Sequence, residues 1–226
     1  MKRTIHSRYR ELALALAEEK LSAARSRKAA GKKAPILSPQ QIKQMEQYIE
    51  ECSNTPAADC LAFRLSYLAG LRAAEINRLS IADLVEKDGS ISSTVTVRPT
   101  VGKGKKGRNI PMHPKISSAV ERFMVLHPEM PFVTFSRQAW RRGDPPRRQS
   151  ITAWTNYIWD LYRRAGLPAH SSHSGRRTFI TNLARNLGKQ FSLRDVQLLA
   201  GHAQLGTTEV YLEPSTNITD LVGRLK

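Results

Sequence analysis

The feature that most constrains the fold is a single change in the spacing at which apolar residues repeat along the sequence. Most of the chain carries apolar residues at helical spacing, but SISSTVTVRPT (90–100) alternates and is rich in β-branched side chains. GRNIPM (107–112) is the expected partner strand, and the Gly-Lys segment VGKGKKG (101–107) is the expected turn with a basic tip. One hairpin among helices predicts a mainly α chain with one small antiparallel sheet.

Capping signals mark the predicted helices. Ser38 suits an N-cap, Pro39 the first helical position, and Gln41 completes a capping box. Ser192 and Asp195 repeat the capping-box spacing before the last clear helix. The expected helical segments are 39–51, 57–70 closed by Gly70, 72–80, 114–127, 151–166, 174–188 and 192–201, with a basic, proline-broken loop WRRGDPPRRQ at 140–149.

The charge of the chain predicts its class of partner. Among 226 residues, 36 are Lys or Arg and 19 are Asp or Glu, so the formal net charge is +17. A surplus of this size predicts a polyanionic partner, and nucleic acid is the first candidate, while a merely basic protein is the alternative. Cys52 and Cys60 have no metal-site or disulfide spacing and are expected to be buried thiols in a reducing compartment.

No apolar run reaches the length of a membrane span, and the first residues lack a secretory apolar segment. We therefore expect no membrane partner and a cytoplasmic, nucleoid-associated location.

Two regions differ in composition. Residues 1–35 hold ten Lys or Arg and three Glu, and we expect a basic helical arm and linker. This arm either lies along DNA, covers a neighbouring subunit or stays solvated. Residues 36–226 are expected to form one compact domain with a tail at 212–226. The tail carries an apolar stripe that packs on its own domain or on a neighbouring protomer; the stripe consists of Ile218, Leu221, Val222 and Leu225.

Two pairs of residues have spacing that suits a site. His173 and Arg176 are three apart at the start of a predicted helix and share one face. Arg72 and Glu75 are also three apart, near enough for the carboxylate to hold the guanidinium. Each pair alone also fits a solvated surface helix or a weak surface ion pair.

Three further residues complete the pattern. Lys103 lies at the expected hairpin tip, and His202 follows the helix-ending glycine at 201. Tyr211 comes nine residues after this histidine; any single tyrosine is usually a half-buried packing residue. The ordered set of Arg, Lys, His-x-x-Arg, Gly-His and Tyr favours a tyrosine nucleophile instead.

Four segments together resemble the catalytic domain of the tyrosine recombinases, also called the phage integrase family. The resemblance runs from about Ile36 to the end of the chain, and its segments are GLRAAEI (70–76), VGKGKKGRNIPM (101–112), HSGRRTFITNLA (173–184) and LLAGHAQLGTTEVYLEP (198–214). It implies a site-specific DNA recombinase that forms a covalent 3′-phosphotyrosyl intermediate through Tyr211, without a metal ion or another cofactor.

The resemblance also implies a role for each site residue. Around Tyr211 it places Arg72, Lys103, His173, Arg176 and His202, and it gives Glu75 the support of the first arginine. Two guanidiniums suit the charge that develops on the phosphate, and Lys103 suits the acid that protonates the leaving oxygen. The other basic residues that we expect to contact DNA are Lys105, Lys106, Arg108, Arg141, Arg142, Arg147, Arg148 and Arg177.

Two alternatives use the same fold. One is a DNA-binding regulator with little strand exchange, and the other is a type IB topoisomerase-like enzyme that nicks and closes DNA. Typical family members carry a helical DNA-clamping domain before the catalytic one, whereas 35 residues precede the match here, which favours a compact form. We expect a free monomer, a tetramer on paired DNA sites, and accessory DNA-bending or directionality proteins.

Overall fold

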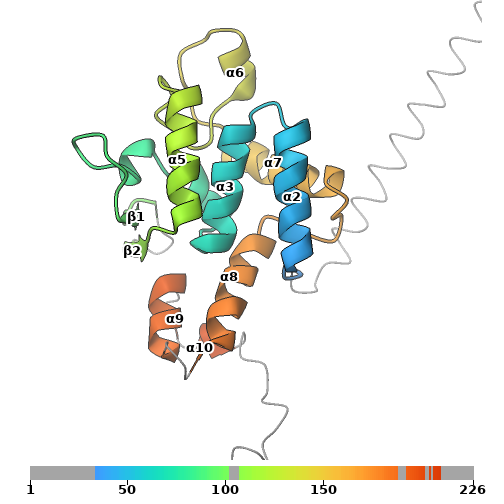
Figure 1. Cartoon of the computed structure of the whole chain (residues 1–226), viewed down its shortest axis with the longest axis vertical. Helices are drawn as coiled ribbons and strands as arrows, with labels where there is room; N and C mark the ends of the chain where they lie inside the picture. Colours follow the sequence, from blue (N-terminus) through green and yellow to red (C-terminus); the bar gives the residue numbers. More distant parts are fainter. Residues whose placement is uncertain (1–33, 102–106, 188–191, 202–203, 205, 210–226) are drawn as a thin grey trace, which may run out of the picture. The chain divides into compact units, whose positions relative to one another are not determined.

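The computed structural model describes residues 34–101, 107–187, 192–201, 204 and 206–209. This part of the chain is mainly helical with a two-stranded antiparallel sheet, as predicted (Figure 1). The helices are α2 (Pro39–Cys52), α3 (Pro56–Leu68), α4 (Ala73–Arg78), the 3₁₀ turn η1 (Ile81–Asp83), α5 (Pro114–Leu126), α6 (Arg137–Arg141), α7 (Ile151–Arg164), α8 (Ser174–Arg185), α9 (Leu193–Ala200) and α10 (Gly206–Glu209). The strands are β1 (Thr94–Val97) and β2 (Arg108–Pro111), with Val95 opposite Ile110.

The predicted capping signals are present at the helix starts. The Ser38 hydroxyl accepts the N–H of Gln41 at 3.2 Å, and the Gln41 side chain accepts the N–H of Ser38 at 2.9 Å. The same reciprocal pair, Ser192 and Asp195, starts α9. Local hydrogen bonds of this kind satisfy backbone donors that the first helical turn leaves unpaired.

Two sequence expectations were wrong in detail. The basic segment expected as a loop from residue 140 begins inside α6, because Ser136 caps the start of that short helix, which ends at Arg141. Only Cys60 is a buried thiol, since Cys52 is the last residue of α2 and is exposed.

Helix α3 is the centre of the domain. It contacts α2, α5 and α8, and in Figure 1 it lies between α2 and α5. Nearly all of its side chains are buried, including Leu61 and Leu65, which are fully inaccessible. Because α3 is buried on nearly all sides, it is the scaffold for the helices around it.

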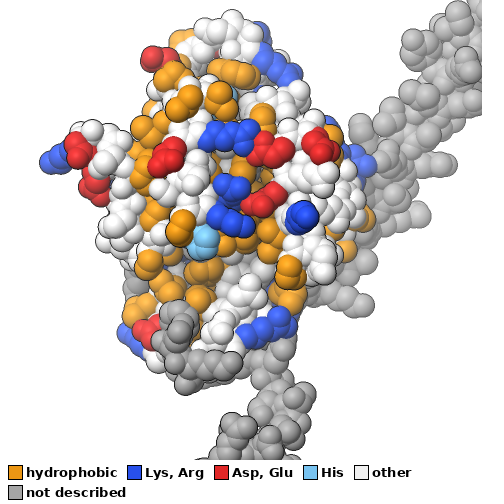
Figure 2. All heavy atoms as spheres, viewed as in Figure 1, with side chains coloured by type: hydrophobic (Ala, Val, Ile, Leu, Met, Phe, Trp, Pro, Cys, Tyr) orange, Lys and Arg blue, Asp and Glu red, His pale blue; other side chains and the backbone are white. Residues whose placement is uncertain are grey.

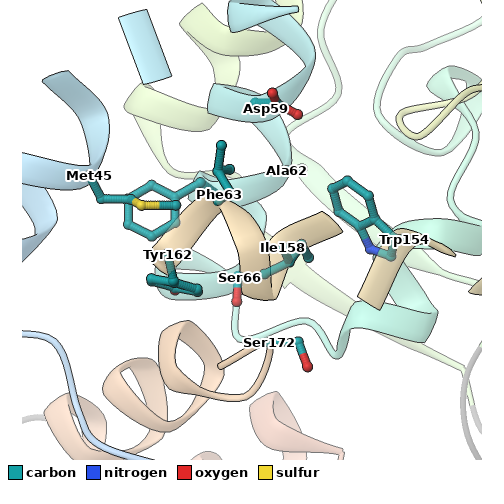
Figure 3. Close-up of a pocket in the computed structure, with 10 residues that line it drawn as sticks. Met45, Asp59, Ala62, Phe63, Ser66, Trp154, Ile158, Tyr162 and Ser172 are labelled. Carbon is teal, nitrogen blue, oxygen red and sulfur yellow. The ribbon is translucent and has the colours of Figure 1, made fainter. Parts of the chain in front are cut away.

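The interior between α3 and α7 is closely filled. Figure 3 shows Phe63, Trp154 and Tyr162 gathered there, around a cavity of about 20 Å³. A space of that size is far too small for a nucleotide or a comparable substrate. This cavity is therefore not the candidate site.

The face over α2, α3 and α5 is balanced in charge. Figure 2 shows acidic and basic side chains side by side across it. Arg64 pairs with Glu46 at 3.0 Å, and Arg122 pairs with Glu50 through two hydrogen bonds. Because its cations are matched by carboxylates, this face offers little attraction to a polyanion.

Helices α8 and α9 pack on each other through a small apolar cluster. Its buried members are Ile180, Val196 and Ala200, with Phe179, Leu183 and Leu187 at the margin. Among the residues that the structure describes, no helix has both the length and the apolar character needed to cross a membrane.

Candidate active site

The turn after α3 positions the first predicted arginine. Gly70 has φ +64° and ends the helix, as predicted, and Arg72 becomes the N-cap of α4. The N–H of Arg72 donates to Oε2 of Glu75 at 2.8 Å, and Nη1 of Arg72 donates to Oε1 at 2.8 Å. The predicted contact between this arginine and Glu75 is present, and it fixes the guanidinium on the first turn of α4.

Helix α4 is itself held at both ends. Nε1 of Trp154 donates to the carbonyl of Ala73 at 3.1 Å. Nδ2 of Asn77 donates to Oγ1 of Thr134 at 3.0 Å and to the carbonyl of Gln149 at 2.9 Å. Hydrogen bonds at each end therefore hold the short helix that follows Arg72 in place.

Arg176 joins three segments that are far apart in the sequence. Its side chain is buried on α8, where Nη1 donates to the carbonyl of Gly70 and Nη2 to the carbonyl of Ala200, each at 2.6 Å. The guanidinium thus lies between the turn that leads to Arg72 and the C-terminal end of α9. A cation at the carbonyl end of a helix is also favoured by the helix dipole.

His173 is the N-cap of α8 and is exposed at its start. Its pKa lies below the usual value, first because partial burial of the ring disfavours the charged form, and then because of the positive charges of Arg176 and Arg72. The neutral ring that results is able to accept a proton. His173 and Arg176 lie on the first turn of α8, and Arg176 binds the carbonyl of Gly70, two residues before Arg72.

Glu75 is the electrostatic centre of the cluster. Only 1% of the residue is exposed, and its carboxylate accepts from Arg72 and, through two hydrogen bonds of 3.1 and 2.9 Å, from Arg108. Burial by itself would raise the pKa of Glu75, but Arg108 and then Arg72 lower it to about 2. The carboxylate is therefore charged at neutral pH and binds both guanidiniums.

Arg108, which the sequence predicts as a DNA contact, is largely buried. Its side chain is 10% exposed and is turned inward onto Glu75 and the carbonyl of Leu199. The burial pattern of β2 explains this position, because Arg108 is two residues before the buried Ile110 and shares its face. That alternation is visible in the sequence and is a signal that could have indicated an inward arginine.

The structure describes only part of the predicted catalytic set. Gly201 ends α9 with φ +61°, as predicted for the residue before His202. The remaining predicted residues lie outside the described residues: Lys103, Lys105, Lys106, His202 and Tyr211. The tail 212–226 and residues 1–33 of the arm also lie outside them.

A basic hollow lies between α6 and the start of α7. It has a volume of about 440 Å³, and its lining includes Arg137, Arg147, Arg148, Gln149 and Ser150. Arg137 is bound internally by Asp59 and Thr55, whereas Arg147 is exposed. The carbonyl of Gln149, which lines the hollow, accepts a hydrogen bond from Asn77, so the hollow adjoins the C-terminal end of α4.

The other predicted DNA contacts have different surroundings. Arg141 and Arg142 are exposed, and Arg142 pairs with Asp144 at 3.0 Å. Arg148 is half-buried with its guanidinium over the ring of Phe132, and Arg177 is half-buried on α8. Across the described ranges, no three His, Cys, Asp or Glu side chains gather as metal ligands.

Curated relatives of the chain are tyrosine recombinases. The chain is 33% identical over 156 residues to tyrosine recombinase XerC of Brucella suis biovar 1, an overlap of 69% of this chain and 46% of the relative. It is 28% identical over 181 residues to tyrosine recombinase XerA of Pyrococcus furiosus, covering 79% of this chain and 59% of the relative. The chain thus spans about half the length of the curated relatives that it matches.

Solved structures share the fold. A crystal structure of XerA recombinase aligns with a TM-score of 0.62 and 24% identity, over 86% of this chain and 66% of that one. The XerH site-specific recombinase bound to its difH substrate aligns with a TM-score of 0.62 and 20% identity, over 86% and 55%.

The family model described as the phage integrase family matches residues 35–217, which include every segment that builds the cluster around Arg72, His173 and Arg176. The chain therefore belongs to the phage integrase family.

Proposed function

We propose that the protein is a site-specific DNA recombinase that cleaves and rejoins DNA through a covalent 3′-phosphotyrosyl intermediate. The observation that carries this proposal is the convergence of Arg72, His173 and Arg176 beside the C-terminal end of α9. Two guanidiniums and a neutral imidazole at one surface site suit a phosphodiester, because the phosphate gains negative charge during substitution and a proton has to move.

In the proposed reaction, the hydroxyl oxygen of Tyr211 attacks the scissile phosphorus as its proton departs, and His173 assists this proton transfer. The bond between phosphorus and the 5′-oxygen breaks, and Lys103 protonates the 5′-oxygen as it leaves. Arg72 and Arg176 stabilise the five-coordinate phosphate, to which His202 also donates a hydrogen bond.

The reverse step rejoins the DNA without any cofactor. A 5′-hydroxyl attacks the phosphotyrosine, the DNA phosphodiester is restored and Tyr211 leaves with a proton. The number of phosphoester bonds is the same before and after, so no external energy source is required. When the attacking hydroxyl belongs to a second duplex, the outcome is integration, excision or inversion.

Duplex DNA is the proposed partner, and the hollow beside α4 is a proposed contact with its backbone. Arg147 and Arg148 line this hollow next to the first turn of α7, where backbone N–H groups also favour anions. Lys105, Lys106, Arg141, Arg142 and Arg177 remain proposed contacts. Because the proposed substrate is duplex DNA, the proposed place of action is the nucleoid, in the cytoplasm.

We also propose how the domains and protomers act together. Residues 1–35 form a basic arm, and residues 36–226 form the catalytic domain with its tail. The free protein is a monomer, since a short tail buries too little surface to hold a dimer. On paired DNA sites four protomers assemble, each docking its tail on a neighbour, and accessory DNA-bending or directionality proteins set the outcome.

A nicked suicide substrate tests the proposed chemistry. Wild-type protein and the control Tyr48→Phe are expected to form a covalent protein–DNA band on denaturing electrophoresis, and Tyr211→Phe is expected to bind DNA without forming one. Wild-type binding without an adduct would instead support the DNA-binding regulator. A two-site plasmid then separates recombination, which rearranges the DNA between the sites, from a topoisomerase, which only relaxes it.

Deletion after Ser215 tests the assembly. The truncated chain is expected to keep single-site cleavage and to lose strand exchange between two sites. Full recombination by this truncation would show that the tail does not couple the protomers. Light scattering of the free full-length chain should give the mass of a monomer.

A further inference from the structure

Arg108 connects two parts of the candidate site, the pair of Arg72 and Glu75 and the last turn of α9. Its Nη1 and Nη2 donate to the two oxygens of Glu75 at 3.1 and 2.9 Å, and its Nε donates to the carbonyl of Leu199 at 3.1 Å. One planar guanidinium therefore contacts the glutamate that holds Arg72 and the last turn of α9. It links these two elements directly.

The end of α9 is closely fitted to this arginine. A Cβ atom at Gly201 would lie 2.9 Å from Nη1 of Arg108 and 3.2 Å from its Cδ and Cζ, so the backbone packs directly on the side chain. Arg108 binds the carbonyl of Leu199 and Arg176 binds that of Ala200. The last helical carbonyls lack partners within the helix, and two cations fix them here.

Charge balance gives Arg108 a second effect. A buried carboxylate beside Arg72 would cancel much of the positive potential that this arginine offers to a phosphate. Arg108 supplies a second cation to the same carboxylate, so the cluster of Arg72, Glu75 and Arg108 keeps a net charge of +1. In a poorly solvated site this compensation acts at short range and is little screened by salt.

We propose that Arg108 is a positioning residue, which holds Arg72 and the C-terminal end of α9 in one arrangement and does not contact DNA. The effect on cleavage rests on the proposed function, because it concerns the arginine that binds the scissile phosphate. The claim that Arg108 orders α9 and leaves DNA affinity alone is independent of any activity.

The test compares Arg108→Gln with two other arginine variants. Arg122→Gln is the matched control, because Arg122 also binds a glutamate through two hydrogen bonds but lies on the charge-balanced face. Arg147→Gln represents an exposed arginine in the basic hollow. Each variant is measured for DNA affinity over a range of salt, for single-turnover cleavage at saturating DNA, and for hydrogen exchange of the amides in α9.

Arg108→Gln is expected to change DNA affinity by less than about twofold and to leave its salt dependence unchanged. Cleavage of bound DNA should fall about a hundredfold, since small displacements of positioned groups cost about that much. Exchange of the α9 amides should rise about fivefold, as expected for the loss of one hydrogen bond. Arg122→Gln should change none of these, and Arg147→Gln should weaken binding and lower the salt slope by about one.

Arg108→Lys is the conservative variant that controls for a folding defect. It keeps the positive charge beside Glu75 but cannot reproduce the planar fork, so cleavage should fall about tenfold, between the wild type and Arg108→Gln. Circular dichroism of every variant confirms that the compared proteins are folded.

Three results would overturn the assignment. A weaker, less salt-dependent affinity in Arg108→Gln, like that of Arg147→Gln, would make Arg108 a DNA contact. Unchanged exchange in α9 would show that it does not order this helix, and unchanged cleavage would show that it does not position Arg72. A wild-type protein that forms no adduct would refute the proposed function alone, because affinity and exchange still decide the role of Arg108.

Discussion

Replacing Gly70 by alanine is expected to destabilise the fold and the site together. The residue has φ +64°, a conformation that costs a residue with a Cβ about 1–2 kcal/mol. The added methyl group would also overlap Cδ1 of Phe179 and lie 2.8 Å from Cε1 of the same ring. Overpacking of this kind costs about 1–3 kcal/mol, so the free energy of unfolding should fall by about 2–5 kcal/mol in total.

Gly89→Ala is the matched control for this change. Gly89 also has a positive φ, +85°, but a methyl group added there would have no atom within 4 Å. It should lose only the backbone part, about 1–2 kcal/mol, and the difference between the two variants should report the clash with Phe179. Urea unfolding at constant temperature, with midpoints and slopes fitted for both variants, measures that difference.

The same substitution should also affect cleavage. The carbonyl of Gly70 accepts a hydrogen bond from Arg176, and Phe179 lies one turn further along α8. A displaced ring would shift both partners, so single-turnover cleavage should fall more in Gly70→Ala than in Gly89→Ala. Equal losses of stability in the two variants would refute the reasoning, since they would mean that Phe179 moves aside without cost.

Three further predictions concern the candidate site. Arg72→Lys should lose about a hundredfold in cleavage with a much smaller loss of binding, because a point charge does not replace the planar fork; cleavage at the wild-type rate would reduce Arg72 to an ordinary phosphate contact. A DNA substrate with a 5′-bridging sulfur has a leaving group that needs no proton, so it should restore cleavage to Lys103→Ala and not to Arg176→Ala, and equal rescue of both would argue against Lys103 as the acid. The pKa of about 2 for Glu75, against 4.5 ordinarily, implies roughly 3 kcal/mol of stability that is fully present above about pH 4.5 and is lost as the pH falls towards 2. The stability advantage of wild type over Glu75→Gln should therefore shrink between about pH 5 and about pH 3. Glu50 forms a half-exposed surface pair with Arg122, so the stability advantage of wild type over Glu50→Gln should stay small throughout.

Local interactions explain why so much of the fold was predictable. The capping boxes at Ser38 and Ser192 and the contact between Arg72 and Glu75 each join residues three apart. The alternation of residues 94–97 is a property of neighbouring side chains. Such features depend on a few adjacent residues, so a sequence pattern specifies them directly. The start of α6 was missed because a weak local cap at Ser136 competed with the loop composition that follows it.

The assembly of the site depends on contacts over long distances in the chain. Arg176 binds carbonyls 106 and 24 residues away, and Arg108 binds Glu75 and Leu199 at separations of 33 and 91 residues. Sequence order and family resemblance suggested which residues belong together, but no local pattern states which donor meets which carbonyl. Packing of α8 and α9 beside α3 and β2 selects those partners. The same holds for Arg108, which was predicted as a DNA contact: its guanidinium lies on Glu75 and on the carbonyl of Leu199 because the tertiary fold brings these acceptors to it.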